Sequence, residues 1–301
     1  MRRIILSLLG VFLLCTSLSA CDACGCGVGG GGFGLLGLYR SNFIGLQYGY
    51  AGFRSYYSSG EATGTEDAFH TTTLSARFSP LDRFRVQVSQ SYHANRRTGE
   101  VGDQQLDGFG DLRIGAVYTL LNDRIVLKDQ LLYLEAGFDL FLPTGRYVAD
   151  PLEDYFLPDN FSPGRGAVAY SPNFLVALSG QRMGFSFSGE LKIHGKTEGD
   201  YRFGTESRLA AQAFSELLLG KQSNWVPFVG LQFDHITANR SRSGNDVHAT
   251  GGKALLGRAG VQFRFPRFTC GSTLLIPLAD DYANGEVRSG LRLSADVYYQ
   301  F

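Results

Sequence analysis

The sequence predicts an all-β fold, a transmembrane antiparallel up-and-down β-barrel of about twelve strands, on three observations. Apolar and polar residues alternate with a period of two over residues 43–301, as strands with one face on lipid and one on water require. Short turns alternate with longer polar connections over the same region. The chain also begins with the pattern of a secretory signal, which directs a protein out of the cytoplasm.

The composition favours strands and excludes several other classes of protein. The chain holds 39 Gly, 23 Phe, 15 Tyr and only 9 Pro, and aromatic residues are enriched in strands. Lys plus Arg and Asp plus Glu each total 28, so no net field would recruit nucleic acid, and no nucleic-acid partner is expected. After residue 20 no apolar run is long enough for a transmembrane helix, so strands must make any membrane crossing.

The amino terminus follows the plan of a secretory signal. Two arginines precede the apolar stretch 4–14, and small residues follow, which predicts a signal peptide over residues 1–20. The tetrapeptide at 18–21 resembles the lipobox of bacterial lipoproteins, which implies that Cys21 carries a lipid anchor. The alternative is ordinary cleavage near Ala20, which would leave Cys21 unmodified.

Residues 21–42 form a predicted Cys- and Gly-rich periplasmic tether ahead of the barrel at 43–301. Cys24 and Cys26 stand behind Cys21 in a Cys-x-x-Cys-x-Cys run. Thiolates at such short spacing can bind one soft ion, Cu(I) or Zn(II), so Cys24 and Cys26 are candidate metal ligands. A disulfide in the oxidising periplasm, or no role, is the alternative.

The last segment shows the alternation most clearly. From Val287 to Phe301 the odd positions carry apolar or small side chains, while the even positions carry mostly polar or charged ones such as Arg292 and Asp296. We expect all the odd positions to face lipid. The same alternation recurs at 84–93, 112–120, 132–140, 185–194 and 206–213.

Charged residues on these strands are expected to point inward. An Arg or Lys on the lipid face would cost roughly 2 to 4 kcal/mol at mid-membrane. The predicted lumen-lining residues are Arg85, Arg113, Glu135, Asp139, Glu190, Lys192, Glu206, Arg208, Asp234, Arg258, Arg292 and Asp296.

The connections give an independent check on the barrel. With both termini in the periplasm, the inner turns are expected to be short and the outer loops long. Predicted inner turns lie at 79–83, 180–184, 220–224 and 265–268, and predicted outer loops at 55–69, 94–107, 144–171, 195–201, 237–250 and 279–286. The inner connection 121–130 is longer than this rule predicts. The loop 144–171 is long enough to be a lid.

The sequence contains no recognisable catalytic motif. A Gly-x-Ser-x-Gly elbow, a His-Glu-x-x-His motif and a phosphate-binding loop are all missing, so we expect neither an enzyme nor a resident cofactor. The ending at Phe301 resembles the terminal aromatic signal read by the barrel assembly machinery. That machinery, outer-membrane lipid and a small-molecule solute are therefore the expected partners, and the outer membrane is the expected location.

Two functions fit the predicted lumen. Opposed charges can line a narrow or gated water-filled path for small solutes, with hydrophobic or aromatic molecules as candidates. They can also pair into a network that closes a structural or anchoring barrel, and a soft-metal role through the amino-terminal cysteines is a further alternative. About twelve strands enclose less space than the 16 to 18 of porins, which argues against a general open pore.

Two short motifs resemble a known family. Residues 107–111 read Asp-Gly-Phe-Gly-Asp ahead of Tyr118, and residues 141–145 read Phe-Leu-Pro-Thr-Gly. They resemble marks of the outer-membrane family named for the MetA pathway of phenol degradation. That resemblance implies a barrel over 43–301 that passes small organic molecules. The lipobox and the cysteine pair are not part of the family pattern.

Overall fold

The computed structural model describes residues 41–56, 64–99, 102–127, 130–149, 157–219 and 223–301. The predicted signal and the cysteines Cys21, Cys24 and Cys26 lie outside these residues, so their roles stay predictions. Within the described residues no helix is long and apolar enough to cross a membrane.

The described residues form one closed antiparallel barrel with twelve strand positions. Two positions are each shared by two consecutive segments, β4 with β5 beside β3 and β9 with β10 beside β11. The predicted fold class and strand number are therefore confirmed. The strands are β1 (Phe43–Ser55), β2 (Thr65–Leu81), β3 (Phe84–Gly99), β4 (Gly102–Phe109), β5 (Leu112–Leu127), β6 (Gln130–Leu142), β7 (Ala169–Ser179), β8 (Met183–His194), β9 (Glu206–Ser215), β10 (Leu217–Leu218), β11 (Asn224–Ile236), β12 (Gly252–Arg264), β13 (Phe268–Tyr282) and β14 (Val287–Gln300), with two short 3-10 helices, η1 (Asp159–Phe161) and η2 (Ala283–Gly285).

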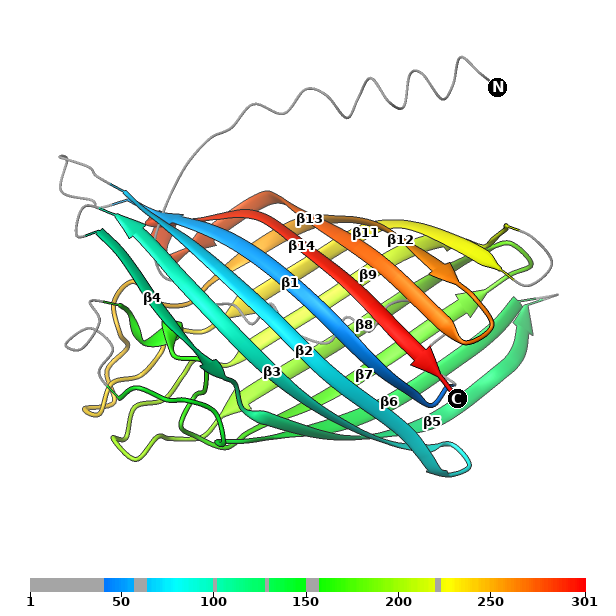
Figure 1. The fold of residues 1–301 in the computed structure, drawn as a ribbon, viewed down its shortest axis with the longest axis horizontal. Helices are drawn as coiled ribbons and strands as arrows, with labels where there is room; N and C mark the ends of the chain where they lie inside the picture. Colours follow the sequence, from blue (N-terminus) through cyan, green and yellow to red (C-terminus); the bar gives the residue numbers. More distant parts are fainter. Residues whose placement is uncertain (1–40, 57–63, 100–101, 128–129, 150–156, 220–222) are drawn as a thin grey trace, which may run out of the picture.

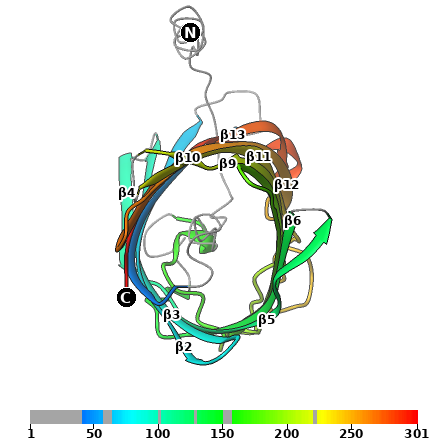
Figure 2. The same cartoon turned by 90° about the vertical axis from the view of Figure 1, so that its right-hand side faces the viewer.

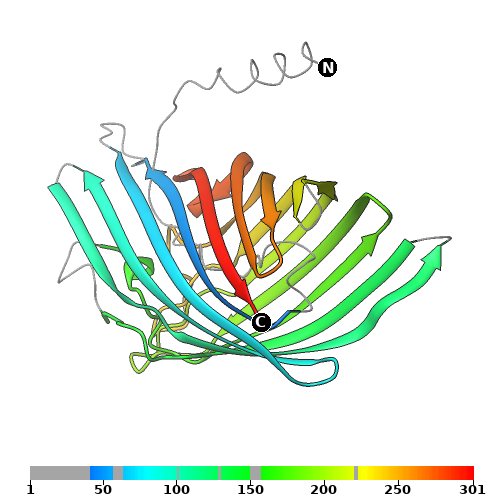
Figure 3. The same ribbon diagram turned by 45° about the vertical axis from the view of Figure 1, so that its right-hand side comes forward.

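The barrel closes where the first strand meets the last. Phe43 lies opposite Gln300 on one side and opposite Arg77 on the other, and β1 and β14 run side by side in Figures 1 and 3. The rings of Phe43 and Tyr298 meet edge to face at 5.0 Å. A Cβ at Gly45 would overlap the Tyr298 ring, so glycine makes room for the aromatic side chain at this seam.

The two faces of the wall follow the predicted alternation. On β1, Ile44 and Leu46 are exposed on the outside, whereas Phe43 and Ala51 are buried. On β3, Arg85 and Ser89 are buried while Val88 is exposed. An apolar exterior around a polar interior is the arrangement of a transmembrane barrel.

The alternation in β14 departs from our expectation at one point. Val287 and Ser289 are buried and Arg288 is exposed, but from Leu291 onward the odd positions face outward. The pairing of β14 with β1 shifts between Ala51 and Phe53, so β14 holds one extra residue there. Because a bulge inverts the facing of every residue beyond it, the prediction for Val287 and Ser289 was wrong.

Short connections gather at one end of the barrel, which we call the turn end, and long ones at the other, the loop end. The turn between β2 and β3 is residues 82–83, and β7 joins β8 through 180–182. Within the inner connection 121–130, β5 extends to Leu127. Two predicted outer loops need correction, because β2 begins at Thr65 within 55–69 and β3 and β4 form a hairpin within 94–107. Polar residues continue the ladder there, so polarity alone did not mark the loops.

The described parts of the long connection between β6 and β7, residues 143–149 and 157–168, fold into the barrel rather than away from it. Leu157 and Phe161 are 0% exposed and pack on Phe69 and Leu106 of the inner wall. The Asn95 side-chain amide donates a hydrogen bond to the Phe161 carbonyl oxygen at 2.7 Å. Figure 2 shows this green segment inside the ring of strands, so the loop end of the lumen is partly filled.

Candidate functional site

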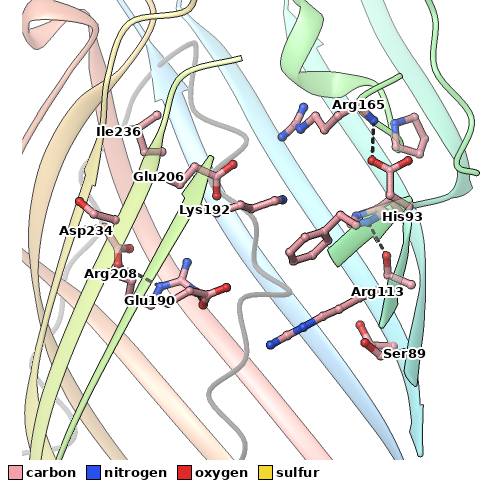
Figure 4. Close-up of a pocket in the computed structure, with 16 residues that line it drawn as sticks. Ser89, His93, Arg113, Arg165, Glu190, Lys192, Glu206, Arg208, Asp234 and Ile236 are labelled. Carbon is pink, nitrogen blue, oxygen red and sulfur yellow. Dashed lines mark hydrogen bonds and ion pairs between the residues drawn. The ribbon is translucent and has the colours of Figure 1, made fainter. Parts of the chain in front are cut away.

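Two adjoining cavities lie in the lumen of the described barrel. The loop-side cavity, about 120 Å³, is bordered by Pro163 and Arg165 of the long loop and by strand residues (Figure 4). The turn-side cavity, about 100 Å³, is bordered by Arg77 and Gln87 near the turn end of β2 and β3. Arg113, Glu190 and Arg208 border both cavities, which places these three side chains between the two.

These three residues belong to a network of ion pairs, which we call the central layer. The Arg113 guanidinium lies 2.6 Å from the Asp139 carboxylate, and Arg208 lies 3.2 Å from Asp234 and 3.8 Å from Glu190. Arg292 of β14 reaches the same Asp234 at 2.8 Å. The partners come from β5, β6, β8, β9, β11 and β14, so the layer lines the inner wall on several sides of the lumen.

The structure places the twelve predicted lumen residues in three settings. Nine border one or both cavities: Arg113, Glu135, Asp139, Glu190, Lys192, Glu206, Arg208, Asp234 and Arg258. Arg85 and Arg292 are buried in ion pairs with Glu135 and Asp234. Asp296 is buried on β14 without bordering either cavity.

Several titratable side chains inside the barrel were not predicted from the sequence. Arg97 holds Asp67 through two hydrogen bonds of 2.9 and 3.2 Å, and its guanidinium lies 4.8 Å from the centre of the Phe161 ring. His194 lies 3.1 Å from Glu206. Asp67 and Arg97 fall in segments we had assigned to loops. The period-two pattern from Phe69 toward Arg77, extended backward, would have found Asp67.

The two family-like motifs meet at the base of the long loop. Both oxygens of the Asp111 carboxylate accept backbone hydrogen bonds, from Gly145 at 3.2 Å and from Arg165 at 3.0 Å. A Cβ at Gly145 would lie 2.6 Å from the Gly110 backbone and 2.8 Å from Gly164. Glycines here let three backbone segments approach closely, so the motifs fasten the loop to the wall.

Aromatic side chains of the loop end pack around the same segment. Phe203 contacts Tyr147 and Tyr201 edge to face, and the Arg165 guanidinium lies 4.6 Å from the centre of its ring. Burial raises the pKa of the Tyr147 phenol and that of Tyr201 above their ordinary value. Both rings therefore stay neutral through physiological pH, as this packing requires.

The loop-side cavity combines hydroxyl, imidazole and charged groups. His93 hydrogen-bonds Ser91 at 2.9 Å through Nε2 and Thr71 at 3.1 Å through Nδ1. The Lys192 ammonium lies 4.3 Å from the centre of the Phe141 ring. Among the described residues no group of three His, Cys, Asp or Glu side chains is placed to hold a metal ion.

We predict that Arg85→Leu destabilises the barrel by about 3 to 5 kcal/mol, because one member of a buried ion pair is lost. Arg85 donates to Tyr133 at 2.8 Å, Glu135 at 3.0 Å and Thr119 at 2.8 Å, so its removal leaves the Glu135 charge uncompensated. Urea unfolding in lipid vesicles would measure the loss. Arg240→Leu, at an exposed loop pair, is the control. Equal stability of the two variants would contradict the prediction.

Comparisons with known proteins agree with this architecture. The family described as putative MetA-pathway of phenol degradation matches residues 44–268. Among solved structures, an outer membrane channel from Pseudomonas putida F1 is 16% identical, with a TM-score of 0.60 over 87% of this chain and 96% of that one.

Two autotransporter barrels are also similar. The β domain of Bordetella BrkA is 11% identical, with a TM-score of 0.51 over 87% of this chain and 100% of that one. The transport unit of AIDA-I from Escherichia coli is 8% identical, with a TM-score of 0.52 over 89% of this chain and 94% of that one. No curated protein matches the sequence. The structural likenesses establish the fold, a closed antiparallel β-barrel.

Proposed function

Since the chain belongs to the outer-membrane family described as the putative MetA pathway of phenol degradation, we propose that it forms a narrow channel for small organic solutes. One observation carries the proposal: the two cavities share Arg113, Glu190 and Arg208 on their borders. A single layer of side chains therefore separates two volumes that occupy successive parts of the lumen. A solute that passes this layer moves from one cavity into the next.

The size and lining of the cavities favour small solutes with an apolar part. At about 120 and 100 Å³, each cavity holds one small ring rather than an oligosaccharide. Phe141 and Ile236 border the loop-side cavity, and Val117 and Leu175 the turn-side cavity, among charged groups. A few oriented polar groups among apolar surfaces are typical of small-molecule sites.

The predicted lumen-lining charges are proposed to set the selectivity of the path. Both signs face the lumen in the central layer, so a simple preference for anions or cations is not expected. The solved channel from Pseudomonas putida F1 has the same fold, which supports the proposal that this barrel is a channel.

We predict that the purified chain, reconstituted in liposomes, passes small aromatic solutes and excludes oligosaccharides. Swelling rates with phenylalanine, glucose and a trisaccharide, none of which crosses the bilayer readily unaided, together with single-channel conductance, would test this. Liposomes carrying the same barrel unfolded by heat serve as the control. A folded barrel that passes neither ions nor solutes would contradict the proposal and favour a closed structural or anchoring role.

A further inference from the structure

Lys192 differs from the other charged groups of the loop-side cavity. It lies on the inner face of β8, half-buried, and its side chain points across the cavity in Figure 4. Among the described residues its ammonium has no hydrogen bond or ion pair, and its contact is the Phe141 ring at 4.3 Å. Arg113 and Arg208, in contrast, each hold a carboxylate.

A half-buried ammonium carries three N–H donors and is costly to leave without acceptors. The π face of Phe141 offsets part of that cost through the cation–π contact. A negatively charged oxygen is the acceptor that an ammonium binds most strongly. The position therefore favours an anionic group that enters from the cavity.

The acidic side chains around the cavity are already engaged. Asp111 accepts from the backbone of Gly145 and Arg165. The remaining three accept from side chains: Glu190 from Ser171 at 3.2 Å, Glu206 from His194 at 3.1 Å, and Asp234 from Gln232 at 2.9 Å, Arg292 at 2.8 Å and Arg208 at 3.2 Å. Glu206 also lies opposite Lys192 in the ladder between β8 and β9, yet no ion pair joins them among the described residues.

We propose that the loop-side cavity binds one small aromatic carboxylate, with the carboxylate on the Lys192 ammonium and the ring against Phe141. The inference rests on the proposed function, because the cavity lies on the proposed path. Arg165 borders the same cavity, so one further positive charge favours the anion. An aromatic ring against Phe141 adds burial and an edge-to-face or offset contact.

The test is direct binding of benzoate to the full chain in detergent, measured by titration calorimetry. We expect Lys192→Met to weaken benzoate binding at least tenfold and Lys192→Arg to keep most of it, because the guanidinium restores the charge. Binding of benzyl alcohol, which lacks the charge, should hardly change in Lys192→Met. Lys196→Met, the same substitution at an exposed loop position, is the matched control and should bind benzoate as the unaltered chain does.

Separate readouts distinguish this site from the channel. Equal benzoate affinity of Lys192→Met and the unaltered chain would overturn the site, as would the absence of benzoate binding in a barrel that passes neutral solutes. Lys192-dependent benzoate binding in a barrel that passes nothing would support the site while removing the channel. Heat-modifiable migration on gels would show that each variant is folded before it is titrated.

Discussion

Replacing Arg113 and Arg208 together by serine is expected to raise the single-channel conductance several-fold and to shift selectivity toward cations. The two guanidinium groups stand between the cavities and pair with Asp139, Glu190 and Asp234 on the neighbouring strands of the inner wall. Their removal widens the central layer and leaves an excess of carboxylates facing the path, and carboxylate rings favour cations. Planar-bilayer recordings with reversal potentials in a salt gradient would measure both effects.

The exposed Arg240→Ser is the control for this double variant, because it removes a guanidinium far from the central layer. Its conductance and reversal potential should match those of the unaltered chain. A double variant that folds and conducts no better than the unaltered chain would show that the restriction lies elsewhere in the lumen.

Asp111→Ala is expected to release the long loop and to raise the passage of solutes through the loop end. The Asp111 carboxylate is the acceptor for the backbone N–H groups of Gly145 and Arg165 on either side of that loop. Without it, two part-buried donors lose their partner, at a cost of about 1 kcal/mol each. Faster liposome swelling, together with new protease cleavage within the loop, would show the release.

Asp107→Ala is the matched control, because Asp107 lies in the same segment but accepts from the exposed Tyr92 hydroxyl at 2.6 Å. It should leave swelling and cleavage unchanged. Unchanged swelling in Asp111→Ala would mean that the loop does not limit the passage of solutes. The prediction that the loop acts as a lid would then be wrong.

The sequence was sufficient for the barrel itself, because lipid on one face and water on the other impose a period-two pattern that needs no tertiary information. The sequence was insufficient at the bulge in β14, where Gly290 and Leu291 lie opposite the single residue Gly52 of β1 and the extra residue reverses which side chains face outward. A bulge leaves no mark in the hydrophobicity pattern. The hairpin of β3 and β4 was also missed, because strands beyond the membrane carry polar side chains on both faces.

The candidate site was partly predictable, because the same period-two pattern shows which side chains point into the barrel. The alternation of apolar and polar residues places Arg113, Glu190 and Arg208 on the inner wall. It does not show which of these side chains lie at the same level along the barrel axis. That depends on the stagger between strands, which hydrogen-bond register fixes. The position of Phe161 inside the lumen could not be predicted from the sequence, because a single aromatic residue in a long loop belongs to no repeating pattern.

The seam between β1 and β14 bears on how the protein reaches its folded state. Ser41 donates a hydrogen bond to Gln300, a partner 259 residues along the chain, and Tyr298 fills the space left by Gly45. Contacts between such distant residues cost much chain entropy and form late, which slows folding. Until this seam forms, two strand edges stay open to other chains, so the interval before closure is when the protein is most vulnerable to aggregation.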